Sequence, residues 1–156
     1  MEFRSIIDIQ FKGFDRSVFE KSKEWLDDSE IKRLTNAPET DQESREQWFQ
    51  SLTNRSDYYI ISAWRGDNPI GVVGLKYITK SDAEAFIYIG EKKYWGKAVG
   101  IEMLKYIIEY GRTLEISSIY AKLLKENIRS YKLASRFGFK IEKDLDEKSI
   151  LMRYYY

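Results

Sequence analysis

The chain has 156 residues, 43% of them apolar, and its 26 basic and 25 acidic side chains give a net charge of +1. That length suits one domain, residues 1–156, with a buried core, and a charge near zero argues against a nucleic-acid-binding protein. The sequence contains no cysteine and no histidine. This excludes disulfides, thiol nucleophiles, an imidazole base and cysteine-based metal sites. We therefore expect catalysis, if there is any, to use carboxylates, hydroxyls, amines and main-chain amides, with no metal.

The chain shows no sign of a membrane span or an export signal. Its apolar runs are only a few residues long, and the opening MEFRSIIDIQF lacks the pattern of a secretory peptide. There is also no repeat and no linker rich in glycine or serine. We expect a soluble, cytoplasmic, single-domain protein without a membrane partner.

Apolar residues recur with strand and helix periods in succession along the chain. The segment Arg65-Gly66-Asp67-Asn68-Pro69 is a strong turn signal between two runs of β-branched and aromatic residues. We expect strands over 4–11, 58–64, 70–77, 84–90, 117–123, 139–142 and 149–155, and helices beginning near Val18, Thr40, Val99 and Ile128. The resulting order β-α-α-β-β-β-α-β-α-β-β predicts a mixed α/β fold.

Polar side chains mark the expected helix starts. Asp15 or Ser17 can cap the first helix, and Thr40 and Glu43 have the spacing of a capping box. Between these helices, the polar stretch 27–39 predicts a loop with one helical turn.

The stretch 88–101, YIGEKKYWGKAVGI, runs from a strand through a short glycine-containing loop into a helix. Small residues at Gly96, Ala98 and Gly100 let main-chain N–H groups approach a ligand, and the helix N-terminus adds a positive dipole. The pattern favours a pyrophosphate cradle. It fits neither the ATP phosphate loop nor the dinucleotide-binding fingerprint. A purely structural strand–helix turn is the alternative.

Residues 94–100, YWGKAVG, resemble the acetyl-CoA pyrophosphate loop of the GNAT N-acetyltransferases, Q/R-x-x-G-x-G/A. Residues 127–130 (NIRS) and 137–139 (FGF) resemble two later features of the same family. Residues 25–28 (WLDD) and 47–49 (QWF) resemble the branch that holds ribosomal-protein N-terminal, spermidine and nucleotide-amino-sugar acetyltransferases. The resemblance spans nearly the whole chain. It implies a GNAT-like domain with a twisted, mostly antiparallel sheet, splayed in the middle and flanked by about four helices.

The family resemblance also implies an activity: direct transfer of an acetyl group from acetyl-CoA to a primary amine, without a covalent enzyme intermediate. The acceptor would be a small molecule, such as an amino sugar or polyamine, or a protein N-terminus. The implied cofactor contacts are Ile87, Tyr88, Ile89, Trp95, Gly96, Lys97, Ala98, Val99, Gly100, Asn127 and Ser130.

Two residues depart from the loop pattern of the family. Trp95 stands in the Gln/Arg position, and Ala98 replaces the middle glycine. Because alanine accepts helical φ, we expect the loop to keep its form. Asn127 has a second explanation, as the N-cap of the last helix.

Glu84 is the expected general base, because strand alternation places it with Phe86 and Tyr88 on one face of the sheet. A surface glutamate after a turn is the alternative. Many family members carry a tyrosine as proton donor where this chain has Ala134. Either the thiolate leaves unassisted, since a thiol pKa is about 8.5, or Ser130 or Tyr131 supplies the proton.

Tyr131 and Ser130 each have a structural explanation as well. In the last helix, Ile128, Tyr131, Ala134 and Phe137 share one face, which we expect to pack against the core. Ser130 fits the start of the same helix as a packing residue.

Three further features leave the acceptor and assembly open. The acidic run 27–30, DDSE, lies where relatives build the acceptor wall and suits a cationic amine, or is a solvated loop. The closing strands are rich in aromatic residues and pair across a homodimer or pack a core. Without the usual acid, a catalytically idle acyl-CoA-binding module is the alternative to an enzyme.

Overall fold

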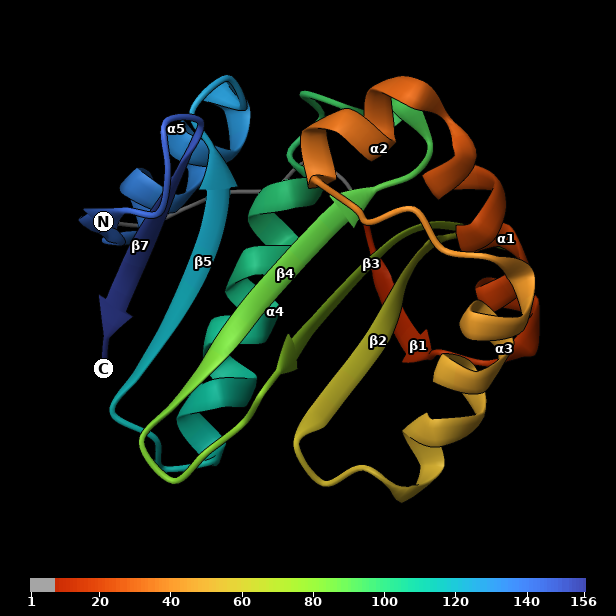
Figure 1. Cartoon of the computed structure of the whole chain (residues 1–156), viewed down its shortest axis with the longest axis horizontal. Coiled ribbons are helices and arrows are strands. Elements are labelled where there is room, and N and C mark those ends of the chain that lie inside the picture. Colours follow the sequence, from red (N-terminus) through yellow and green to blue (C-terminus); the bar gives the residue numbers. More distant parts are fainter. Residues whose placement is uncertain (1–7) are drawn as a thin grey trace.

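The computed structural model describes residues 8–156, which fold into one sheet with helices packed on it (Figure 1). In chain order the elements are β1 (Gln10–Gly13), α1 (Arg16–Asp27), α2 (Ser29–Thr35), α3 (Gln42–Ser51), β2 (Tyr58–Arg65), β3 (Asn68–Lys76), β4 (Asp82–Ile89), α4 (Val99–Thr113), β5 (Ser118–Leu124), α5 (Ile128–Phe137), β6 (Lys140–Asp144) and β7 (Ser149–Tyr155). The strands of this region form one sheet in the order β1-β2-β3-β4-β5-β7-β6. Neighbouring strands run antiparallel except for the parallel pair β4 and β5. The mixed α/β class and the mostly antiparallel sheet are confirmed.

The stretch 27–39, expected to be a loop with one helical turn, contains more helix than that, because seven of these residues fold as α2. The Asp28 carboxylate accepts hydrogen bonds from the amides of Glu30 and Ile31, at 3.0 and 3.1 Å, and so caps the helix. Ile31 is buried and anchors α2 to the core. The described residues therefore contain five α-helices, one more than the sequence indicated.

Two other boundaries differ from expectation. Asp41, not Thr40, caps α3, by accepting a hydrogen bond from the amide of Ser44 at 2.7 Å. The first strand, expected over 4–11, covers Gln10–Gly13 in the described residues, and residues 4–7 lie outside the described region. The cap of α1 is Asp15, one of the two residues expected there.

The sheet separates two apolar layers. Helices α4 and α5 lie behind it in Figure 1, and α1, α2 and α3 lie in front. The core on the α4 side includes Val73, Leu75, Ala83, Ala85, Met103, Ile107, Ile119 and Met152. The core on the α1 side is built on Val18, Trp25, Ile31 and Val72, with Phe86 and Tyr88 packed against it. Even-numbered residues of β4 therefore face α1, and odd-numbered ones face α4.

Strands β4 and β5 pair only at their starts, in the described residues. The register joins Asp82 to Ser118, Ala83 to Ile119 and Glu84 to Tyr120. β4 then continues to Ile89 along β3, while β5 continues along β7. The expected splay is confirmed, and we call the space between the unpaired parts of β4 and β5 the strand gap.

The far end of β4 is fixed by a tryptophan packed on a glycine. Trp25 is 5% exposed, and its indole N–H donates to the Glu91 carboxylate at 3.2 Å. A Cβ on Gly90 would overlap the Trp25 ring. The absence of a side chain at this position therefore sets how closely α1 approaches β4.

The closing strands differ in their exposure to other chains. β7 lies inside the sheet between β5 and β6, and β6 forms the edge. Pairing between copies through these strands would therefore use β6. No helix within residues 8–156 is long and apolar enough to cross a membrane.

Replacing Gly90 by alanine should destabilise the protein by about 2–3 kcal/mol, because the new methyl group meets the Trp25 ring in a packed core. Urea unfolding measures the change. Gly13→Ala is the matched control: its Cβ would meet nothing within 4 Å, so we expect a change within about 0.5 kcal/mol. Equal free energies of unfolding for the two variants would contradict this packing.

Candidate functional site

The strand gap exposes main-chain groups on one edge of β4. The amide of Gly90 donates to the Ile70 carbonyl of β3 at 2.8 Å. Because N–H and C=O groups alternate sides along a strand, those of Ile87 and Ile89 point away from β3 and into the gap. These two residues were predicted to contact the cofactor, and the structure gives their backbone the free edge that this requires.

Trp95 lies across the open end of the strand gap. Its indole N–H donates to the Ile89 carbonyl at 2.9 Å. The Arg129 guanidinium of α5 lies 4.9 Å from the ring centroid, close enough for a cation–π contact. The side chain thus connects the end of β4 to the start of α5. One of the main-chain acceptors expected for a ligand is already hydrogen-bonded to Trp95.

The N-terminus of α4 is left without a side-chain cap. α1, α2, α3 and α5 are capped by aspartate or asparagine, whereas Ala98 at the start of α4 offers no polar atom. Uncapped amides and the helix dipole make this end attractive to an anion. Gly96, Lys97, Ala98 and Val99, all predicted cofactor contacts, form the turn that leads into it.

The backbone of this turn differs from expectation at one residue. Ala98 has φ 68° and lies in the left-handed region, so the expectation of helical φ was wrong. Gly96 is left-handed as well, at φ 74°. The Lys97 amide donates to the Tyr94 carbonyl at 3.2 Å and closes the turn. Alanine costs roughly 1–2 kcal/mol in this conformation, which the surrounding turn must offset.

Gly100 lies where α4 packs against α5, as well as in the predicted phosphate-binding loop. A Cβ at this position would lie 3.0 Å from a methyl carbon of Leu133 on α5. A larger residue at 100 would therefore push α5 away from α4. Any test of anion binding at this turn must use a different residue.

The Asn127 side chain forms hydrogen bonds to both α5 and α2. Its side-chain oxygen accepts from the Ser130 amide at 3.2 Å, which confirms the expected N-cap. Its side-chain nitrogen donates to the Leu34 carbonyl of α2 at 3.3 Å. An ion pair between Arg33 of α2 and Glu126, just before α5, at 2.8 Å makes a second connection. Ser130 meets Asn127 through its main chain, and no hydrogen bond of its hydroxyl is found among the described residues.

Glu84 occupies the last β4–β5 pair, at the closed end of the strand gap, and is 6% exposed. Its side chain is on the α1 side with Phe86, as the alternation predicted. Lys76 approaches one carboxylate oxygen at 3.6 Å and Lys122 the other at 3.5 Å. The oxygen nearer Lys122 is buried and has no hydrogen-bond partner among the described residues. A shielded carboxylate with an unused acceptor can take a proton from a bound donor.

Tyr131 is 37% exposed on α5, a helix whose packing face joins the core on the α4 side of the sheet, whereas the Glu84 side chain is on the α1 side. Its predicted place on the core face was wrong, and Ile128, at 53% exposure, is turned outward with it. Ala134 is buried, and Leu133 and Phe137 pack beside it. The helix is thus rotated so that a neighbouring stripe faces the core. The structure does not bring Tyr131 and Glu84 together.

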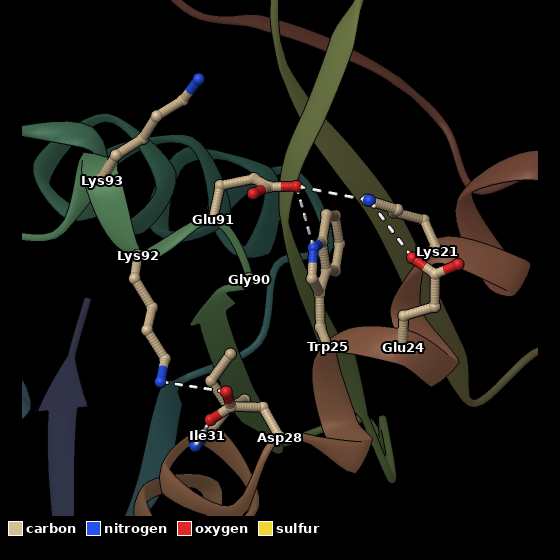
Figure 2. Close-up of a pocket in the computed structure, with 9 residues that line it drawn as sticks. All are labelled: Lys21, Glu24, Trp25, Asp28, Ile31, Gly90, Glu91, Lys92 and Lys93. Carbon is tan, nitrogen blue, oxygen red and sulfur yellow. Dashed lines mark hydrogen bonds and ion pairs between the residues drawn. The ribbon is translucent and has the colours of Figure 1, made fainter.

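A pocket of about 410 Å³ lies beside the end of β4 (Figure 2). Its lining residues are Lys21, Glu24, Trp25, Asp28, Ile31, Gly90, Glu91, Lys92 and Lys93. Lys92 forms ion pairs of 3.0 Å with both Asp28 and Glu30. The Ile31 amide, then Lys92, holds the pKa of Asp28 below its usual value.

The acidic run 27–30 was one candidate for an acceptor wall. Besides the pairing with Lys92, Asp27 forms an ion pair of 2.9 Å with Arg45 of α3. These carboxylates are therefore already engaged with cations of the chain. A wider hollow of about 930 Å³ lies between α2, the end of β5 and the turn before β7, lined by acidic and basic side chains alike. Among the described residues, no group of acidic side chains is arranged to hold a metal ion.

Signals for Glu84, Asn127 and the 94–100 turn were local and visible in the sequence. The lysines beside Glu84 were missed, because they come from β3 and β5, and nothing in the sequence shows which strands are neighbours. The contact between Trp95 and Ile89 was missed as well. Tryptophan at a loop position gives no indication of the carbonyl that its N–H will find.

Comparison with known proteins supplies the family. A family model described as an acetyltransferase (GNAT) domain matches residues 12–140. An uncharacterized protein of Methanocaldococcus jannaschii is 32% identical over 99 residues, which cover 62% of this chain and 20% of that protein. The match thus spans about a fifth of the length of that relative.

Two solved structures have the same fold. Spermidine N-acetyltransferase from Vibrio cholerae, solved with CoA and spermine, superposes with a TM-score of 0.86 at 19% identity, over 94% of this chain and 95% of that one. Campylobacter jejuni N-acetyltransferase PseH, solved with acetyl coenzyme A, gives 0.72 at 22% identity, over 95% and 99%. With the family model covering most of the sequence, the chain belongs to the GNAT acetyltransferase family.

Proposed function

We propose that the chain is an acetyl-CoA-dependent N-acetyltransferase that moves an acetyl group directly to a primary amine. The observation that carries this proposal is the strand gap, which has a free main-chain edge on β4, the uncapped end of α4 at its mouth and a shielded carboxylate at its closed end. The solved relatives with CoA and acetyl coenzyme A bound support it.

In this proposal the N-terminus of α4 holds the pyrophosphate. The turn 96–100 supplies amides and dipole, and Lys97 adds a positive charge on the same turn. The backbone of Ile87 and Ile89 pairs with the amide-containing arm of the cofactor, since amides are both donors and acceptors. Trp95 must give up the Ile89 carbonyl if that acceptor is used. Asn127 and Ser130 border the gap from α5.

Acetyl-CoA supplies an activated thioester carbonyl. An alkylammonium has a pKa of roughly 10, so an acceptor must lose a proton before its nitrogen can attack. Glu84 takes that proton, directly or through a water. The thiolate leaves unassisted because Ala134 carries no proton donor and the Tyr131 side chain is turned outward on α5.

The acceptor class proposed here is a small-molecule amine, such as an amino sugar or a polyamine, or a protein N-terminus. The Vibrio cholerae relative, solved with spermine, supports an amine acceptor in general. An idle acyl-CoA-binding module is the second candidate, favoured by Ala134 alone. It binds acetyl-CoA but releases no CoA thiol with any amine.

Charge reversal at Lys97 should weaken acetyl-CoA binding roughly tenfold, because an acid on the phosphate-binding turn repels the pyrophosphate. Calorimetric titration of the purified protein measures the Kd. Lys80→Glu, in the exposed turn before β4, is the matched control and should bind as the wild type does. A folded wild type that binds no acetyl-CoA would refute the proposed function.

Glu84→Gln should lower kcat by roughly 10²–10⁴-fold, since glutamine keeps the size of the side chain but accepts no proton. The acetyl-CoA Kd should stay within about twofold. CoA thiol release with an accepted amine measures the rate, and Glu109→Gln on the exposed face of α4 is the control. A rate within about twofold of the wild type would remove Glu84 from the mechanism.

A further inference from the structure

Two lysines flank the proposed base at the closed end of the strand gap. The ammonium groups of Lys76 and Lys122 lie 3.6 and 3.5 Å from the two oxygens of Glu84. Lys76 also lies 5.7 Å from the Phe86 ring centroid, which holds it on the α1 side. Glu84 is thus enclosed by cations from the strands on either side of β4. Three charges with a sum of +1 occupy this point.

The other ionisable groups near Glu84 make no ion pair with it. Tyr58 of β2 is neutral at physiological pH, and burial raises its pKa further, to about 12. Burial also raises the pKa of Tyr120 of β5. Arg153 of β7 forms ion pairs with Asp82 at 3.1 Å and with Glu142 at 2.8 Å, and these three charges sum to −1. The positive charge at Glu84 is therefore local to the two ammonium groups that approach its oxygens.

The side chains of Lys76 and Lys122 are partly exposed to solvent, at 29% and 50%. Both therefore remain accessible to a ligand while holding Glu84. The acidic run that would have attracted a polycation is already paired with Lys92 and Arg45. The two ammonium groups that contact the base thus favour an anionic group over a further ammonium group.

We propose, on the basis of the proposed function, that Lys76 and Lys122 determine acceptor specificity, selecting a small amine that carries a phosphate or carboxylate and disfavouring polyamines. The anionic group lies against the ammonium groups, and the reacting nitrogen lies at the Glu84 oxygen that has no hydrogen-bond partner and that Lys122 approaches at 3.5 Å. A polyamine brings further ammonium groups close to Lys76 and Lys122, and like charges repel.

The same lysines assist the proton transfer. The acceptor R–NH₃⁺ gives one proton to Glu84, and the resulting R–NH₂ attacks the thioester carbon. The C–N bond forms, the C–S bond breaks, and CoA leaves as the thiolate, which takes up the second proton from the nitrogen through solvent. Nearby positive charge disfavours the ammonium form of the bound acceptor, so the amine is freed at a lower pH.

Four amines with related skeletons test this specificity. Phosphoethanolamine and β-alanine carry a phosphate and a carboxylate, ethanolamine is the counterpart without an anionic group, and spermidine is the polycation. CoA thiol release gives kcat/KM for each. We expect the better of the two anionic amines to exceed ethanolamine by about tenfold and spermidine by more, with the preference declining at high salt.

The variant to compare is Lys76→Met/Lys122→Met, for which the anionic preference should fall to about one and spermidine turnover should rise several-fold. Lys122→Arg should keep the preference. If the double variant does not fold, Lys122→Met alone is measured in its place, and it should lose part of the preference. Lys105→Met is the matched control, with a side chain 49% exposed on α4 against 50% for Lys122.

Each outcome decides between specificity and a structural role. If the lysines only stabilise buried Glu84, the variants lose activity equally with all acceptors, and the proposal is wrong. Wild-type turnover of spermidine at or above that of the anionic amines overturns it as well. Binding of acetyl-CoA without thiol release from any amine overturns the proposed acetyl transfer itself, and this proposal with it.

Discussion

β4 and β5 share three residue pairs and then separate, and this break in the sheet determines where the rest of the site lies. A strand edge inside a protein leaves N–H and C=O groups without partners, at about 1–3 kcal/mol for each one that is buried. Trp95 reduces the cost by donating to the Ile89 carbonyl. The Trp25 contact with Gly90 and the connections from α2 to Glu126 and Asn127 hold the two sides of the gap in place.

The two ends of the strand gap differ in the charged groups that line them. At the mouth, α4 begins without a side-chain cap, while the other α-helices of the described region begin at acidic or amide caps. At the closed end, a nearly buried carboxylate lies between two ammonium groups. The mouth thus favours an anionic ligand, and the closed end combines a proton acceptor with a positive surround. Neither end needs the cysteine or histidine that the sequence lacks.

Local patterns predicted the strands, the α5 cap at Asn127 and the turn at 94–100, since each depends on residues adjacent in sequence. α2 was not predicted because its one buried anchor, Ile31, gives too weak a periodic signal. The orientation of α5 depends on which stripe meets α4 and the sheet, so Tyr131 was wrongly placed. The left-handed φ of Ala98 follows from the turn as a whole. The lysines around Glu84 depend on strand order, which periodicity does not reveal.

Backbone hydrogen exchange at the strand gap tests the central claim most directly. At saturating acetyl-CoA, the amides of Ile87 and Ile89 should exchange at least about tenfold more slowly, because the cofactor arm completes their edge of β4. The amides of Phe86 and Tyr88 already face β3 and should change little. Unchanged exchange at Ile87 and Ile89 in protein that calorimetry shows to be saturated would contradict the account.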